Sequence, residues 1–331
     1  MVKMFKMALL VVIIGVTLAL PWLINSYQLN LLIQTITFSM LGLAFAFTLK
    51  VGLPRFDIAA WWAVGAYTSA ELMQKAHWPF WPTILVAGLM AVILGWLVYS
   101  IALPRGMMVF LLFGMVIVLA VYQTVGSVHF FGGWGGTGIL PVVKFRDFAF
   151  VSRTSLYFMG LVFLAINIIV YYLLYNSKIG RAWSAIGSSL KLASSVGVDV
   201  VRYRMANVLI SNFFLGVAGA YVVAYNQIAN PAIFNFAASV NVMMYVIVGG
   251  IRFSLIGPML GALIITILPE YMRTFSTWKS VVSSTAIILI IIFLPNGLLG
   301  VVERYLYPWF KKNKLFARFR SNVGGEPQVP A

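Results

Sequence analysis

Ten long apolar stretches decide what this chain can fold into. They lie at residues 7–24, 29–49, 56–74, 82–101, 107–127, 154–175, 205–225, 236–250, 255–271 and 280–295. A helix of roughly 20 apolar residues crosses the approximately 30 Å of hydrocarbon in a bilayer. The predicted fold class is therefore all-α, a polytopic membrane helix bundle with about ten transmembrane helices. The pair at 236–250 and 255–271 is short, and we expect partial or tilted helices there.

The composition agrees with a membrane protein. Apolar residues make up 62% of the chain and charged residues 9%, whereas soluble domains average about 45–50% and about 25%. A water-soluble domain of this length could not bury so much apolar surface, but lipid accepts it because apolar burial drives insertion. We predict a multi-pass protein of the cell (inner) membrane.

The formal net charge of +16 indicates topology rather than a nucleic-acid partner. If the N-terminus is cytoplasmic and every stretch crosses, most of the 23 Lys and Arg residues lie on the inner side. Cytoplasmic loops carry such an excess, so both termini are predicted to be cytoplasmic. The first stretch is expected to be a retained helix, because its apolar run is long and no A-x-A cleavage site precedes Asn25.

Little in the chain suits catalysis. It has no cysteine, which excludes disulfides, thiol nucleophiles and thiolate metal sites. Its only histidines, His77 and His129, lie near predicted membrane ends, where a loop or interfacial position explains them. No G-x-x-x-x-G-K-[ST], H-E-x-x-H or G-x-S-x-G motif occurs. We therefore expect no enzyme activity, no catalytic residue, no metal site and no cofactor in this chain.

Two loops interrupt a single predicted transmembrane domain at 1–305, which a basic cytoplasmic tail at 306–331 follows. The outer loop, at about 128–153, contains the run FGGWGGTGILP, whose interleaved apolar residues favour a compact loop. The inner loop, at about 176–204, has apolar residues at roughly helical spacing between serines and basic residues. That pattern predicts short amphipathic helices that lie against another protein or the lipid surface.

Small residues predict close contacts between helices. Gly257 and Gly261 form a GxxxG pair, and Gly216, Gly219 and Ala220 form a second small face. Such positions let backbones approach closely in lipid, where hydrophobicity gives helices no drive to associate.

Several motifs match one family in their order and spacing. They are GAY at 65–67, NSKIGRAWSAI at 176–186, ASSVGV at 193–198, YRMANVLIS at 203–211, GVAGA at 216–220, the pairs at 249–250, 257–258 and 261–262, and FLPNGLLG at 293–300. Over about residues 40–305 the chain resembles the permease family of branched-chain amino acid ABC transporters. Within these matches, Gly249, Gly250, Gly257 and Gly261 are assigned to helix packing.

The resemblance implies the ABC importer permease fold and a division of labour. Such a permease forms half of a transmembrane pathway, together with a second homologous permease subunit and the surrounding membrane lipid. Two ATP-binding subunits dock on the cytoplasmic side and bind the ATP. A periplasmic or extracellular substrate-binding protein delivers the substrate. The inner loop at 176–204 would be the coupling segment, and the coupling role is carried over to Gly180, Arg181, Ala185, Ile186 and Gly197.

Arg55 and Asp57 are candidates for the substrate path. Relatives usually have small polar residues and glycine ahead of the GAY motif, but this chain has GLPRFDI at 52–58. Interrupted helices at membrane depth commonly line substrate paths, and the pair suits the carboxylate and ammonium of an amino acid. Alternatively the pair neutralises itself, or Arg55 snorkels to the inner boundary. If the pair lines the path, Asp57→Asn is expected to cut transport without preventing assembly.

The favoured function is a permease subunit of a binding-protein-dependent ABC importer for branched-chain amino acids. One alternative is a permease for another small polar solute, namely urea, an amide, a sugar or a nucleoside. A less favoured alternative is an ion-coupled carrier. Proton or sodium coupling normally uses carboxylates within the membrane. The apolar stretches of this chain contain few of them, so the importer is preferred.

Overall fold

The computed structural model describes residues 15, 17–145, 148–251, 255–271, 285, 289, 292–293 and 297–300. The predicted tail at 306–331 lies outside the described residues, and the predicted spans at 7–24 and 280–295 lie largely outside them. The predicted span count is therefore compared with the structure only between these two stretches.

Five described helices are long and apolar enough to cross a membrane by length and composition. They are α2 (Ser26–Leu49), α4 (Phe80–Ala102, continued by a 3-10 turn to Arg105), α5 (Met107–Ser127), α6 (Arg153–Asn176) and α9 (Val200–Asn226). The strands of the described part are β1 (Lys144–Phe145) and β2 (Phe148–Ala149), an antiparallel hairpin in the predicted outer loop. The all-α, polytopic fold class is thereby confirmed.

Three further apolar helices are shorter. They are α3 (Ile58–Gln74), α10 (Phe236–Gly249) and α11 (Ile256–Tyr271). At about 1.5 Å per residue, the 14 residues of α10 are too few to cross about 30 Å of hydrocarbon upright. This agrees with the expectation of a partial helix at 236–250, whereas α11 is described only as far as Tyr271.

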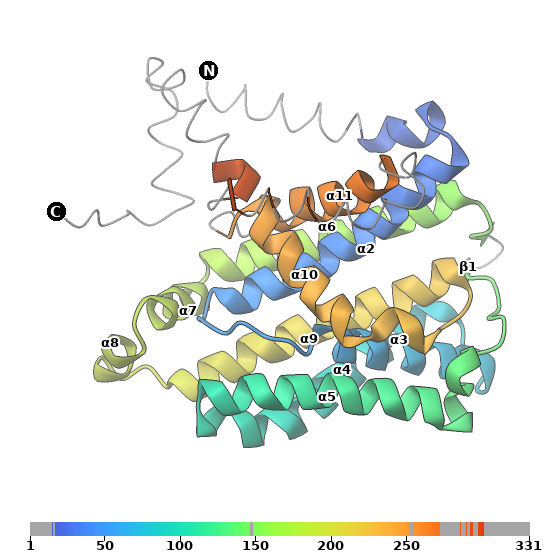
Figure 1. Ribbon diagram of the computed structural model, residues 1–331. Helices are drawn as coiled ribbons and strands as arrows, with labels where there is room; N and C mark the ends of the chain where they lie inside the picture. Colours follow the sequence, from blue (N-terminus) through green and yellow to red (C-terminus); the bar gives the residue numbers. More distant parts are fainter. Residues whose placement is uncertain are drawn as a thin grey trace, which may run out of the picture.

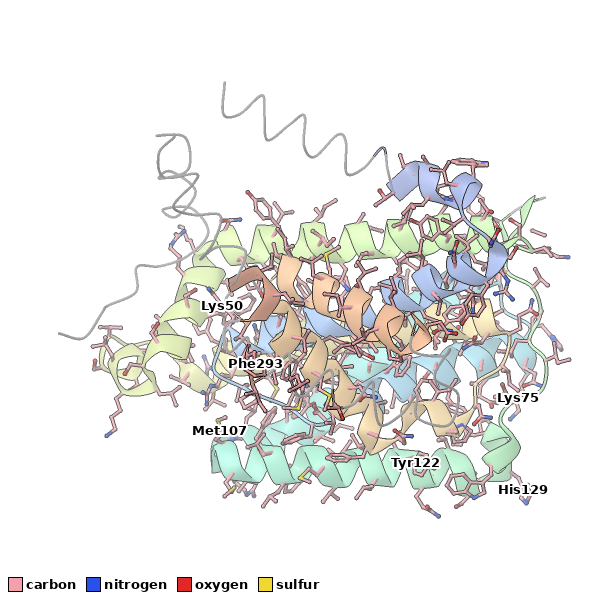
Figure 2. All side chains as sticks on the ribbon, turned by 45° about the horizontal axis from the view of Figure 1, so that its top comes forward. Lys50, Lys75, Met107, Tyr122, His129 and Phe293 are labelled. Atoms are coloured by element: carbon pink, nitrogen blue, oxygen red, sulfur yellow. The ribbon has the colours of Figure 1, made fainter. Side chains whose placement is uncertain are left out.

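The helices run alongside one another, with the connections gathered at two opposite ends (Figure 1). Lys50 and Met107 lie at one end, and Lys75 and His129 lie at the other (Figure 2). The short helices α7 (Lys178–Ser188) and α8 (Leu190–Ser195) share the end that carries Lys50. The predicted inner and outer connections are thus separated by the length of the bundle.

Helices α2 and α9 form the centre of the bundle, whereas α4 and α5 expose long apolar faces. In the most apolar window, 78% of α2 and of α9 is buried, compared with 33% of α4 and 22% of α5. Most of the large exposed side chains of the two outer helices are apolar, among them Leu85, Leu89, Trp96, Met108, Leu112 and Val116. Such a face suits lipid tails rather than water.

Glycines set a close helix contact between α3 and α9. A Cβ added at Gly65 would lie less than 3.0 Å from backbone atoms of Gly216, and one at Gly219 equally close to the carbonyl oxygen of Trp62. The GAY and GVAGA motifs therefore pack against each other. Small residues permit this approach, and the approach supplies the van der Waals contact that holds helices together in lipid.

The predicted packing glycines Gly249, Gly250, Gly257 and Gly261 lie where α10 meets α11. A Cβ at Gly249 would overlap the carbonyl oxygen of Gly257, and one at Gly261 would overlap that of Tyr245. Gly250 ends α10 with a φ of 112°, which residues with side chains rarely adopt.

We expect Gly65→Ala to separate α3 from α9, because the new Cβ would meet backbone that cannot rotate away. Overpacking of this kind costs about 1–3 kcal/mol. The measurement is the temperature at which the detergent-solubilised protein leaves its monodisperse size-exclusion peak. Gly114→Ala is the matched control, since its Cβ would lie 3.6 Å from its nearest neighbour, an ordinary contact. Equal temperatures for the two variants would contradict the prediction.

Candidate functional site

Residues 50–57 connect α2 to α3 and do not remain at the surface. Gly52 has a φ of +66°, so the chain turns sharply directly after α2. Pro54 lacks the N–H that a continuing helix would need. The turn directs Arg55 and Asp57 into the bundle, where both side chains are 0% exposed.

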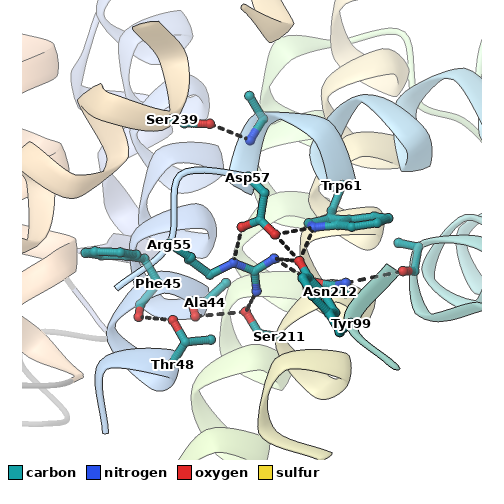
Figure 3. Close-up of polar contacts among 12 residues, drawn as sticks. Ala44, Phe45, Thr48, Arg55, Asp57, Trp61, Tyr99, Ser211, Asn212 and Ser239 are labelled. Atoms are coloured by element: carbon teal, nitrogen blue, oxygen red, sulfur yellow. Dashed lines mark hydrogen bonds and ion pairs between the residues drawn. The ribbon is translucent and has the colours of Figure 1, made fainter. Parts of the chain in front are cut away.

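The Arg55 guanidinium contacts Asp57 and two helices, α4 and α9 (Figure 3). Its Nε donates to Asp57 Oδ1 at 2.6 Å. Its Nη2 donates to the Tyr99 hydroxyl of α4 at 2.9 Å and to Asn212 Oδ1 of α9 at 2.7 Å. Its Nη1 lies 3.3 Å from Ser211 Oγ, which donates in turn to the carbonyl oxygen of Ala44 in α2. The positive charge is therefore fixed by side chains distant in sequence.

Both oxygens of the Asp57 carboxylate are engaged. Oδ1 accepts from Arg55, and Oδ2 accepts from the Trp61 indole Nε1 at 3.0 Å and from the Tyr99 hydroxyl. The result is an electrically neutral group, the Arg55–Asp57 cluster, formed by Arg55, Asp57, Trp61, Tyr99, Ser211 and Asn212. Every charged atom in it has an internal partner, as a charge removed from water requires.

The interpretation that Arg55 snorkels to the inner boundary is wrong, because its side chain has no exposed surface. The alternative that the pair neutralises itself agrees with the geometry. Whether the pair lines the substrate path stays a prediction. In the described conformation the polar atoms of Arg55 and Asp57 face each other and their helix partners.

The predicted short helices of the inner loop are present, and each begins with a polar cap. Ser177 Oγ accepts from the Gly180 N–H at the start of α7, and Ser189 Oγ accepts from the Leu192 N–H at the start of α8. A capping side chain satisfies an N–H that the helix leaves unpaired at its first turn. Serines therefore define where both short helices of the predicted coupling segment begin.

Trp183 anchors α7 to the bundle. Its side chain is 0% exposed, its indole N–H donates to the Tyr203 carbonyl at 2.8 Å, and its ring packs edge-on against Phe47 at 5.0 Å. Gly180 lies against the carbonyl oxygens of Leu174 and Tyr175, with no room for a Cβ. The predicted coupling segment is therefore packed against the bundle through α7 rather than being a loose connector.

The five predicted coupling residues occupy two different environments. Gly180 and Ile186 are buried on the face that packs against the bundle, whereas Arg181, Ala185 and Gly197 are exposed. Gly197 has a φ of +81°, which favours glycine at the turn after α8. Arg181, Ala185 and Gly197 are therefore the predicted coupling residues that a partner protein could reach in the described structure.

The predicted coupling segment contacts the connection that carries Arg55. A Cβ added at Gly187 would lie less than 3.0 Å from the Lys50 carbonyl oxygen. Arg204, near the start of α9, donates through Nε and Nη2 to the Val51 carbonyl oxygen at 3.3 and 3.2 Å. Residues 50–57 therefore join the α7–α8 end of the molecule to the Arg55–Asp57 cluster.

Sequence reasoning missed four members of this cluster. Ser211 and Asn212 interrupt an apolar helix, and adjacent polar residues at such a position are a usable signal of an internal polar contact. Tyr99 and Trp61 carry no comparable signal, because aromatic residues are frequent throughout the chain. Among the described residues no three His, Asp or Glu side chains gather as a metal site would require.

Comparisons with known proteins agree over most of the chain. The family described as "Branched-chain amino acid transport system / permease component" matches residues 27–294. The permease protein LivM of the high-affinity branched-chain amino acid transport system of Escherichia coli K12 is 26% identical, covering 92% of this chain and 76% of LivM. The LivH permease protein of the same organism is 32% identical over 43% of this chain and 45% of LivH. No solved structure gave a significant match.

We expect Asp57→Asn to destabilise the folded protein, because the buried guanidinium of Arg55 would lose its counter-charge. Breaking a buried pair from one side costs about 3–5 kcal/mol. The double variant Arg55→Met/Asp57→Asn removes both charges and should recover part of that loss. Thermal unfolding in detergent, followed by size exclusion, is the measurement.

Asp199→Asn is the matched control for this substitution. Asp199 pairs with Arg202 at 2.9 Å, but the two side chains are 47% and 87% exposed. Exposed pairs contribute about 0–1 kcal/mol, and asparagine still caps a helix. If Asp57→Asn is as stable as Asp199→Asn and only transport falls, the expectation from the sequence is the correct one.

Proposed function

Because this chain belongs to the family of branched-chain amino acid transport system permease components, we propose that it is the membrane-spanning subunit of a binding-protein-dependent ABC importer for branched-chain amino acids. The observation that carries the proposal is the family match from residue 27 to residue 294. The relatives are transport permeases rather than enzymes. The apolar helices agree with that role.

The partners in this proposal are those of an ABC importer. A second permease subunit would complete the pathway, two ATP-binding subunits would dock on the cytoplasmic side, and a periplasmic or extracellular binding protein would deliver the substrate. One observation supports a pair of permeases: E. coli K12 has two permease proteins of this transport system, LivM and LivH, and both resemble this chain. Both termini would be cytoplasmic, and ATP would be bound by the partner subunits.

The exposed side of the coupling segment supports docking of the ATP-binding subunits. Leu192 is 67% exposed and Val196 is 71% exposed, at an end of the bundle that also carries exposed Arg181 and Lys191. Large apolar side chains exposed beside charges are typical of a protein contact. Because Trp183 contacts Phe47 of α2 and Tyr203 of α9, a displacement of this segment would also move these two helices.

Residues 50–57 would carry that displacement further. They contact Gly187 of α7 at one end and place Arg55 and Asp57 between α3, α4 and α9 at the other. In this proposal Arg55 and Asp57 reach the substrate only in a state of the transport cycle in which the cluster has opened. Their direct contact with a substrate remains a proposal that the Asp57→Asn measurement addresses.

Restoring the gene to cells that lack it should restore uptake of labelled leucine. Unlabelled valine should suppress this uptake, urea and ribose should not, and depletion of ATP should abolish it. Suppression by urea or ribose instead would assign the importer to a different small solute. Uptake that survives loss of ATP and follows an ion gradient would contradict the importer itself.

Leu192→Asp should reduce the amount of ATP-binding subunits that co-purify with the permease, because a charge would replace an apolar contact at the docking face. The side chain is exposed, so folding should be unchanged. Ile139→Asp is the matched control, since Ile139 is 86% exposed in the outer loop at the opposite end. Equal co-purification of the two variants would place the docking surface elsewhere.

A further inference from the structure

A cleft of about 220 Å³ opens between α2, α3, α10 and the 3-10 turn Pro231–Phe234. Its volume far exceeds the approximately 10–15 Å³ that one water molecule needs. The walls are mainly apolar and aromatic, with contributions from Phe38, Leu41, Trp62, Asn241, Val242 and Tyr245. Every residue that lines the cleft is uncharged.

Trp62, which lines this cleft, carries an unused hydrogen-bond donor. Its side chain is 2% exposed, and its indole Nε1 has no hydrogen-bond partner among the described residues. An indole N–H can only donate, and leaving a donor buried without an acceptor is unfavourable. The neighbouring Trp61 is different, because its Nε1 is occupied by Asp57 and Tyr99.

The Trp62 ring is held in place by its surroundings. It packs edge-on against Phe234 at 4.7 Å, and the backbone of Trp62 is in close contact with Gly219 of α9. The indole is thus part of a fixed wall, and its donor cannot turn freely toward another partner. Its Nε1 is covered in the described conformation, so an acceptor in the cleft would reach it only after a small displacement of this wall.

The two asparagine side chains of the cleft differ in their hydrogen bonding and exposure. Asn235 is committed, because its Oδ1 accepts from the Ala238 N–H at 2.9 Å and its Nδ2 donates to the Ala232 carbonyl at 3.1 Å. Asn241 lies further along α10 and its side chain is exposed. Its amide carries both a donor and an acceptor, so it can serve a carboxylate or an ammonium group.

We propose that this cleft is a solute site of the permease, which takes a small amino acid with an apolar side chain. The apolar wall would receive the side chain, the Trp62 Nε1–H would donate to the carboxylate, and Asn241 would contact the polar end. The proposal rests on the transport function proposed above and names where the solute is held. Neutral donors give a weak site, which suits a solute that must be released again on the other side.

The cleft is connected to the Arg55–Asp57 cluster through α3. Ser239 Oγ of α10 accepts from the Ala59 N–H at 2.9 Å, and Phe236 of α10 contacts Phe56. The start of α3 therefore carries Asp57 on one side and holds α10 on the other. A displacement of residues 50–57 would change the wall of the solute site directly.

The first test is Trp62→Phe, which keeps the ring and removes only the donor. In cells that lack the native gene, initial uptake of labelled leucine at subsaturating concentration should fall about tenfold or more, the effect of losing one hydrogen bond to a charged group. Amount in the membrane and co-purifying ATP-binding subunits should stay unchanged. Trp78→Phe, at a 46% exposed tryptophan of the outer end, should transport as the native protein does.

Asn241→Phe is a second variant that does not depend on a buried position. The exposed side chain can be enlarged without overpacking, and the ring would obstruct the cleft, so uptake should again fall. Failure of the native gene to restore leucine uptake would refute the proposed function. Native uptake together with native-like uptake by both Trp62→Phe and Asn241→Phe would refute the solute site alone.

A labelling experiment tests occupancy directly, because the chain contains no cysteine. Asn241→Cys in the assembled transporter gives this chain a single thiol, whose reaction with a small hydrophilic methanethiosulfonate should be slowed by leucine and not by urea. Equal rates with and without leucine would overturn the proposal. A thiol that reacts only after denaturation would also overturn it, because the cleft would then be closed by a neighbouring helix or lipid.

Discussion

Close backbone contact between α3 and α9 is the interaction on which the rest of the described bundle depends. In lipid, apolar side chains gain nothing by leaving the solvent, so helices associate through tight packing and internal hydrogen bonds. Gly65 and Gly216 provide the first of these, and the Arg55–Asp57 cluster provides the second at the same pair of helices. Because α9 also contacts α2, α4 and α6, its position relative to α3 determines where the remaining helices lie.

The sequence predicted the elements well where a single physical rule was sufficient. Apolar length located α2, α4, α5, α6 and α9, because the bilayer thickness leaves few alternatives. The same comparison with the bilayer thickness showed that the stretches after residue 236 are short. Small residues pointed to helix contacts, but they did not reveal which helices would meet.

The site was harder to predict, because its partners are remote in sequence. Arg55 finds Tyr99 44 positions away and Asn212 157 positions away. Nothing local distinguishes an arginine that reaches the membrane surface from one that a turn at Gly52 directs inward. The coupling residues show the same limit: a motif identified the segment, but only the packing of Trp183 separates the buried Gly180 and Ile186 from the exposed Arg181.

The neutral cluster also has a consequence for how sequences of this kind can diverge. Arg55 and Asp57 share no surface with water, so replacing one of them first creates an unpaired internal charge. A lineage that lost the pair would have to pass through that intermediate or change both positions together. The two residues are therefore expected to be inherited or lost as one unit, with Tyr99 and Asn212 free to vary only afterwards.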